Sequence, residues 1–333
     1  MFDIPLLLII IIGVALVFDF TNGAHDCANA IATVVSTKVL SPRTAVMMAA
    51  VLNLVGAFLG TEVAHTLGGG IVQPEVVNNS EILVLAGLLG AIMWNSITWY
   101  FGIPSSSSHA LIGGLIGAAL AYAGPEAVNA VSIVKKVIAP LFLSPLAGFC
   151  AGFILMTVLT LVFYRIKRAA ANAFFRKAQV LSAGFMALSH GLNDAQKTMG
   201  VITLALLIFG RIDDITVPLW VKVACALAMA AGTSIGGWKI VKTMGHKIFK
   251  LEPVHGFAAE SAAALVIAGA SSLGAPISTT HTITACIFGV GSSKRLSAVR
   301  WGVAGNLVVA WLLTIPAAAA VGAISFFLLD LIF

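Results

Sequence analysis

Apolar stretches occupy almost the whole chain of 333 residues, and only short polar intervals separate them. An uninterrupted apolar stretch of about 18 residues or more is typical of a helix that crosses a lipid bilayer. The longest polar intervals, near 165–178 and 238–255, are too short to fold as soluble domains. The pattern therefore predicts an all-α polytopic membrane protein with one membrane domain.

The composition supports this prediction, because 59% of the residues are hydrophobic and only 10% are charged. A mean hydropathy of +1.03 leaves too little polar surface for a soluble protein. In the opening "MFDIP", Asp3 stands where a secretory signal carries basic residues, so we expect the first apolar run, "IPLLLIIIIGVALVF", to be a retained helix. The four cysteines lie far apart in apolar surroundings and are interpreted as packing residues, not as disulfides or metal ligands.

Two motifs occur twice along the chain. "TNGAHDCANA" in 21–30 returns as "SHGLNDAQKT" in 189–198, and "GIPSSSSHALIGGLIG" in 102–117 returns as "GAPISTTHTITACIFG" in 274–289. The two pairs have the same order and nearly the same separation, which is typical of transporters built from two duplicated halves. A weaker third pair, Gly56/Gly60 against Gly232/Gly236, has the small-xxx-small spacing that lets helices approach closely.

The duplication predicts a first repeat in 1–164, a basic linker in 165–178 and a second repeat in 179–333. When the N-terminus is placed outside, the Lys and Arg residues on the inner side are Lys38, Arg43, five in 165–177, four in 239–250 and three in 294–300. Those outside are Lys135, Lys136, Arg211 and Lys222. This excess satisfies the positive-inside rule. We therefore predict a protein of the cell (inner) membrane with two inverted-topology repeats, both termini outside and the linker in the cytoplasm.

Proline and serine interrupt the apolar pattern inside segment 81–123 and at the corresponding place in the second repeat. Because proline ends a helix and a following Ser or Thr caps the next one, we expect discontinuous helices and membrane-embedded helical hairpins. A helix N-terminus with free N–H groups and several hydroxyl donors forms an anion site, and two facing ends suit a tetrahedral oxyanion. The predicted substrate-binding residues are Ser105, Ser106, Ser107, Ser108, Ser278, Thr279, Thr280 and Gln196.

Each copy of the first motif carries an aspartate, Asp26 or Asp194, in an apolar setting. A carboxylate in hydrocarbon is costly and would repel an anion, so we expect each one to bind a proton or a cation before the substrate binds. Nearby amide oxygens favour sodium, whereas His25 and Asp19, two turns before Asp26 on the same helix face, favour a proton. The predicted coupling-ion residues are Asp26, Asp194, Asn22, Asn29, Asn193, His25 and Asp19. No metal site is firmly assigned, and sodium at Asp26 and Asp194 is the alternative.

Other polar residues in or near the motifs have two possible interpretations. Lys197 follows Asp194 by three residues, so it forms either an intrahelical ion pair or a direct contact with the anion. His109 and His281 follow the hydroxyl clusters and either cap them or take part in function. The histidines outside the repeated motifs are expected to face water: His65, His246 and His255.

The motifs "NGAHDCANAIATVVST", "FGIPSSSSHALIGG", "SHGLNDAQKTMG" and "LGAPISTTHT" together resemble the duplicated signatures of the inorganic phosphate transporter (Pit) family. The resemblance spans nearly the whole chain and is strongest to bacterial low-affinity phosphate permeases. It implies secondary transport of phosphate, an inverted-repeat helical fold, a homodimer and a site built from the four motifs. The proton-coupled bacterial permeases share a histidine at the position of His25 and an acid near Asp19. This similarity favours coupling to protons. It also favours transport of phosphate as a complex with a divalent metal.

We therefore predict a secondary active transporter of inorganic phosphate, coupled to protons and working by alternating access. Sodium coupling and sulfate transport on the same fold are the alternatives within this class. A passive anion channel is less favoured because it has no need of two buried carboxylates. An intramembrane hydrolase using Ser106 or Ser108 with His109 and Asp26 is less favoured because every polar element is duplicated. No enzymatic activity, cofactor or nucleic-acid partner is expected. Contacts with membrane lipids are expected.

Overall fold

The computed structural model describes residues 5–70 and 82–332, which are mostly helical and contain no strand. The long helices in chain order are α1 (Leu6–Ser36), α2 (Pro42–Gly56), α3 (Glu62–Gly70), α5 (Ile82–Phe101), α6 (Ser107–Ala123), α8 (Ala139–Phe163), α9 (Arg168–Ile208), α10 (Leu219–Ile235), α12 (Pro253–Ser272), α13 (Thr279–Lys294) and α14 (Trp301–Asp330). The short helices are η1 (Gly124–Ala127), α7 (Ala130–Ile133), η2 (Val134–Ile138), α11 (Trp238–Lys242), η3 (Thr243–Lys247) and η4 (Leu296–Ala298).

Six stretches of the described chain are long and apolar enough to cross a membrane, and the bent pair α10 and α11–η3 adds a seventh when it is counted as one span. This confirms the predicted class, a multi-pass helical membrane protein. The longest helix, α9, falls outside this set because a run of polar residues interrupts its middle. That helix is nevertheless buried over most of its second half, so its polar residues lie inside the bundle.

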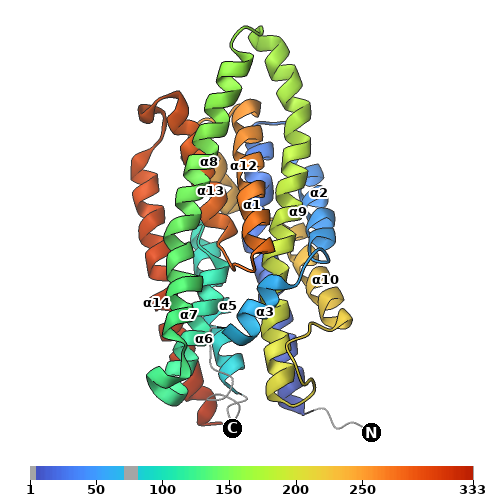
Figure 1. The fold of residues 1–333 in the computed structure, drawn as a ribbon, viewed down its shortest axis with the longest axis vertical. Helices are drawn as coiled ribbons and strands as arrows, with labels where there is room; N and C mark the ends of the chain where they lie inside the picture. Colours follow the sequence, from blue (N-terminus) through green and yellow to red (C-terminus); the bar gives the residue numbers. More distant parts are fainter. Residues whose placement is uncertain (1–4, 71–81, 333) are drawn as a thin grey trace.

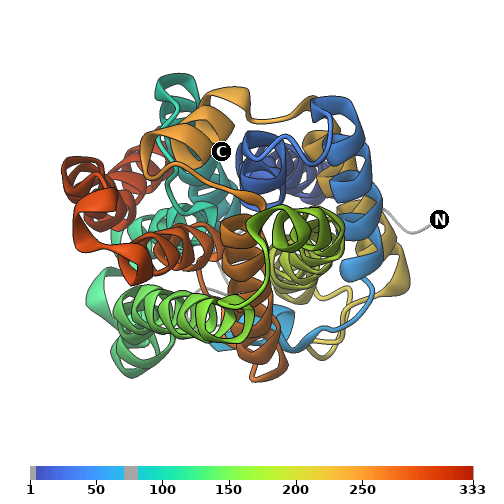
Figure 2. The same ribbon diagram turned by 90° about the horizontal axis from the view of Figure 1, so that it is seen from above.

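The start of α1 and the end of α14 lie at one end of the molecule, and the basic connection between α8 and α9 lies at the other (Figure 1). Helices α5 and α6 occupy the half nearer the termini, whereas α12 and α13 occupy the half nearer the connection (Figure 1). Seen from above, α2 and α10 lie at one edge of the bundle and α14 at the opposite edge, with α1 and α9 between them (Figure 2). We call the two ends of the molecule the terminal end and the linker end.

The two predicted helix breaks are present and have the same local structure. Helix α5 ends before Gly102 and α12 ends before Gly274, and both glycines have a φ of +67°, a conformation that strains any residue with a Cβ atom. The chain then runs through Pro104 or Pro276 before α6 or α13 begins. Because proline cannot continue the preceding helix, each helix pair is interrupted at the place that the sequence indicates.

Glycines let helices from different halves of the chain pack backbone against backbone. A Cβ atom at Gly232 would lie 1.9 Å from a carbonyl oxygen of α1, and one at Gly23 would lie 2.3 Å from a carbonyl oxygen of α10. Helices α2 and α9 meet in the same way, since Cβ atoms at Gly56 and Gly191 would each lie 2.2 Å from a backbone oxygen of the other helix. The close approach predicted for Gly56 and Gly232 is therefore confirmed.

Outside the repeated motifs, two of the three histidines are placed as expected. His65 and His246 are exposed. The prediction that His255 faces water is wrong, because its side chain is buried and its Nδ1 accepts a hydrogen bond from the backbone N–H of Glu252 at 3.0 Å. His255 thereby completes a capping box at the start of α12, a local role that its sequence position alone does not indicate.

Candidate functional site

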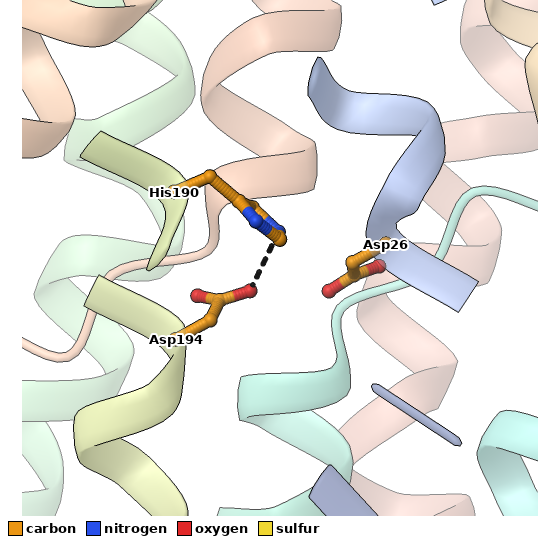
Figure 3. A group of neighbouring side chains, drawn as sticks. All are labelled: Asp26, His190 and Asp194. Atoms are coloured by element: carbon orange, nitrogen blue, oxygen red, sulfur yellow. Dashed lines mark ion pairs between the residues drawn. The ribbon is translucent and has the colours of Figure 1, made fainter. Parts of the chain in front are cut away.

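Three ionisable side chains meet between α1 and α9, in the middle of the bundle. Asp26 of α1 points toward Asp194 and His190 of α9 (Figure 3). One ligand atom from each of these residues lies within 4.8 Å of the other two, and all three side chains are buried. We call these residues, with the side chains that bond to them, the central polar cluster.

Asp26 has hydrogen-bonding partners on its own helix and at the starts of α6 and α13. Its Oδ1 lies 2.7 Å from Nδ1 of His25 and accepts a hydrogen bond from the Thr280 hydroxyl at 3.2 Å. Its Oδ2 accepts from the Ser107 hydroxyl at 2.8 Å. The other nitrogen of His25 lies 3.2 Å from Oγ1 of Thr98 and 3.4 Å from Oγ of Ser105. The carboxylate on α1 thus joins the first residues of both α6 and α13.

Asp194 has a cation as its partner. Lys197, one turn further along α9, forms an ion pair with Oδ1, while the Thr279 hydroxyl donates to Oδ2 at 3.1 Å. His190 Nε2 lies 3.1 Å from the same Oδ2. Lys197 also donates to the Ser108 hydroxyl at 2.5 Å. The intrahelical ion pair that the sequence left open is therefore present, and its ammonium group also reaches α6.

The hydroxyl groups of the two breaks divide into caps and cluster members. Ser106 and Ser278 are the N-caps of α6 and α13, and each accepts from the backbone N–H three residues later at 3.2 Å. Between Thr279 and Thr280 lies the amide of Asn29, which donates to both hydroxyls, at 3.2 and 2.9 Å. The hydroxyls that bond to the carboxylates or to Lys197 are those of Ser107, Ser108, Thr279 and Thr280. The two helix N-termini thus converge on the carboxylates.

Behind the caps, the rings of His109 and His281 lie against each other with centroids 4.9 Å apart. His281 also stacks on Trp311 of α14 at 4.1 Å, and the Trp311 indole N–H donates to the carbonyl of Pro104 at 3.0 Å. These contacts hold the two breaks together. Both histidines thus lie at the back of the central polar cluster.

Four further predicted residues make no hydrogen bond to the side chains described above. Asp19 accepts from the Thr198 hydroxyl at 2.9 Å, toward the terminal end, and Asn193 donates to Ser271 at 2.7 Å. The amide oxygens of Asn22 and Asn193 are buried and have no hydrogen-bond partner among the described residues. Gln196 lies on the other side of α9, where its Oε1 accepts from the N–H of Val63 at 2.8 Å at the start of α3. The structure therefore does not bring Gln196 together with the hydroxyls.

Sequence reasoning missed His190, although it lies inside the repeated motif. His190 aligns with Asn22 of the first repeat, so the comparison of the two copies did not single it out as a shared residue. Its Nδ1 lies 3.1 Å from Oδ1 of Asn53 in α2, whose amide in turn donates to Thr233 of α10 at 3.1 Å. Each half therefore places one histidine beside its aspartate, but at different points on the helix.

Sequence reasoning also missed Glu260, a fully buried acid in α12. It bonds to Thr33 of α1 and to Gln179 and Ser182 of α9. The signal that could have found it is the rule that applied to Asp26, an acid inside an apolar helix. We call these four residues, with Thr37, which donates to Gln179 at 2.9 Å, the Glu260 cluster.

A multi-pass helical bundle with interrupted helices and a buried site of carboxylates and hydroxyls is the architecture of a secondary transporter. The sequence over residues 22–322 matches the description "Phosphate transporter family". The chain belongs to the phosphate transporter family, whose members are transporters and not enzymes.

Among its relatives is a "Probable low-affinity inorganic phosphate transporter" of Bacillus subtilis (strain 168), 50% identical, which aligns over 99% of this chain and 100% of that protein. A protein of the same description from Rhizobium meliloti (strain 1021) is 50% identical over 98% of this chain and 97% of that one. A solved structure described as "The sodium-dependent phosphate transporter" has a TM-score of 0.88 and 26% identity, and covers 98% of this chain and 100% of that chain.

Proposed function

We propose that this protein is a secondary active transporter of inorganic phosphate that couples uptake to protons by alternating access. The observation that carries the proposal is the convergence of two helix N-termini and two carboxylates, one of each from either half of the chain, on one buried cluster. The hydroxyls of Ser107, Ser108, Thr279 and Thr280 can turn from their present acceptors to the oxygens of a phosphate.

The charges of the cluster support coupling to a cation. Asp26 and Asp194 contribute two negative charges, and Lys197 contributes one positive charge. With neutral histidines the cluster therefore has a net negative charge, which repels an anion in a medium of low dielectric constant. A proton on each His–Asp pair, at His25 and at His190, reverses the sign. Protonation of the two His–Asp pairs thus precedes or accompanies phosphate binding.

The packing of the helices supports inverted repeats that move against each other. Helix α1 packs on α10 as α9 packs on α2, and α6 packs on α14 as α13 packs on α8. The α5–α6 pair enters from the terminal end and the α12–α13 pair from the linker end (Figure 1), as expected of two hairpins related by an axis in the membrane plane. We propose repeats in 1–164 and 179–333, joined by the 165–178 linker.

The charge asymmetry of the sequence supports placing the linker in the cytoplasm and both termini outside the cell (inner) membrane. A homodimer and transport of phosphate as a divalent metal complex are further proposals, which rest on the family resemblance.

A sodium-coupled cycle is the second candidate. The solved relative described as sodium-dependent favours it, as do the buried amide oxygens of Asn22 and Asn193, which have no hydrogen-bond partner among the described residues. Sodium prefers oxygen ligands of this kind. Against it, each carboxylate of the cluster has a histidine nitrogen within 3.1 Å, and nitrogen is a poor ligand for a hard cation.

The test is uptake of radiolabelled phosphate into proteoliposomes under an imposed proton gradient or an imposed sodium gradient, with unlabelled sulfate as competitor. Uphill uptake driven by protons and insensitive to sulfate is the expected result. Uptake driven only by sodium supports the second candidate, and competition by sulfate without phosphate accumulation refutes the proposed substrate. Normal gradient-driven uptake by Asp26→Asn and Asp194→Asn refutes the proposed coupling site.

A further inference from the structure

We propose that a cavity at the linker end binds one anionic phospholipid, with the lipid's phosphodiester at Arg176 and an acyl chain along Leu159 and Met156 of α8. The cavity has a volume of about 720 Å³ and lies between the end of α8, the start of α9 and the start of α12. The inference goes beyond the proposed transport, because it needs only that the bundle lies in a membrane. Neither the repeated motifs nor the relatives' descriptions name a lipid.

The first argument is the level of the cavity in the membrane. Helix α8 belongs to a stretch that is long and apolar enough to cross a membrane, and its last residue, Phe163, lines the cavity. Tyr164 follows and also lines it, and Tyr is enriched where hydrocarbon meets the headgroups. Leu161 and Val162, next to Phe163, are 68% and 62% exposed, as expected of a surface that faces lipid. The cavity therefore lies where the headgroup layer begins, beside lipid-facing side chains.

The second argument is that the lining has an apolar part and a charged part, as a phospholipid has. Met156 and Leu159 lie about two turns and one turn further into the span than Phe163. Contact with an acyl chain removes such a wall from water, whereas a hydrated phosphate ion leaves it wet. The apolar side chains that line the cavity come from all three helices and the segment before α12, and they include Met156, Leu159, Phe163, Phe175, Leu251 and Val254.

The third argument is charge. Among the described residues that line the cavity, the charged ones are Arg168, Arg176 and Glu252. Arg168 forms an ion pair with Glu252 at 2.8 Å, and both side chains are exposed. Arg176 donates to the backbone carbonyl of Lys38 at 3.1 Å and forms no ion pair with an acid in the part of the chain that the structure describes. A carbonyl oxygen does not neutralise a guanidinium, so the lining keeps one positive charge. The single negative charge of a phosphodiester balances it.

The experiment measures displacement of radiolabelled dioleoylphosphatidylglycerol from the purified protein in detergent. Unlabelled dioleoylphosphatidylglycerol should displace the label. Dioleoylphosphatidylcholine, which has the same chains and no net charge, should displace it far more weakly, and millimolar inorganic phosphate should not displace it. Equal displacement by the two lipids overturns the proposal, because the headgroup is then not recognised. Displacement by inorganic phosphate also overturns it, because the cavity then takes the free anion.

A charge variant and its control test the position of the headgroup. Arg176→Gln should weaken binding of the labelled lipid about fivefold, which is the contribution of one cation at a membrane surface. Lys177→Gln is the matched control, because it removes the same charge from the next residue of α9, which is exposed and lies outside the lining. The control should bind like wild type. Equal weakening by the two variants overturns the proposal, since the lipid is then attracted by the basic segment as a whole.

A second variant, Ala171→Trp, covers the case in which Arg176→Gln does not fold. Ala171 lines the cavity from α9, and an indole at this position fills space that the lipid needs while both arginines remain. We expect weaker binding of the labelled lipid by a variant that unfolds, without added lipid, at the wild-type temperature. Wild-type affinity in Ala171→Trp overturns the proposal, because the lipid then binds elsewhere.

Discussion

Replacement of Asp194 by Asn removes one charge from a buried ion pair and should destabilise the fold as well as abolish transport. Lys197 and Asp194 are each about 1% exposed, so water cannot replace the lost carboxylate. Breaking a buried pair in this way costs about 3–5 kcal/mol. Lys197 keeps the Ser108 hydroxyl and the Ile277 carbonyl as acceptors, at 2.5 and 3.1 Å, and we therefore expect a loss near the lower end, about 3 kcal/mol.

The assay is thermal unfolding of the purified protein in detergent, where a loss of this size lowers the midpoint by about 6 °C for a chain of this length. Asp26→Asn is the matched control, because Asp26 has no lysine partner and its neighbours can bond to an amide. The double variant Asp194→Asn/Lys197→Met removes both charges and should unfold near the wild-type temperature while remaining inactive. An Asp194→Asn midpoint equal to that of Asp26→Asn would refute the reasoning, since Lys197 would then not need its partner.

Three further predictions concern packing, capping and coupling. Gly232→Ala places a Cβ atom 1.9 Å from the carbonyl oxygen of Phe20 and should lower the free energy of unfolding by about 1–3 kcal/mol. Gly13→Ala, whose Cβ atom would have nothing within 4 Å, is the control and should not lower it. Equal unfolding midpoints for the two variants would contradict the backbone packing of α1 on α10. Ser278→Ala removes the N-cap of α13 and should lower stability by about 0.5–2 kcal/mol and raise the KM for phosphate, and an unchanged KM in uptake assays would show that the cap does not position the helix end. His25→Gln removes the ring beside Asp26 and should reduce proton-driven uptake in proteoliposomes while exchange without a gradient persists; undiminished proton-driven uptake would exclude His25 as a proton carrier.

The sequence by itself determined the class of protein and the chemistry available to it. Hydropathy predicted the membrane helices. Pro104 and Pro276, with the serines that follow them, predicted both helix breaks and both caps. These features depend on neighbouring residues along the chain, because proline ends a helix and serine caps one wherever they occur. The repeated motifs also indicated the two aspartates that the structure brings together.

Only the tertiary structure decided which polar residues share the site. His190 and Gln196 belong to the same motif, but the direction of α9 against α1 turns His190 toward Asp26 and leaves Gln196 against the start of α3. Glu260 joins the residues near Thr33 only because α12 packs beside α1 and α9. The physical reason is that α9 carries polar groups on more than one side, and distant parts of the chain supply the neighbours that decide which group faces which partner.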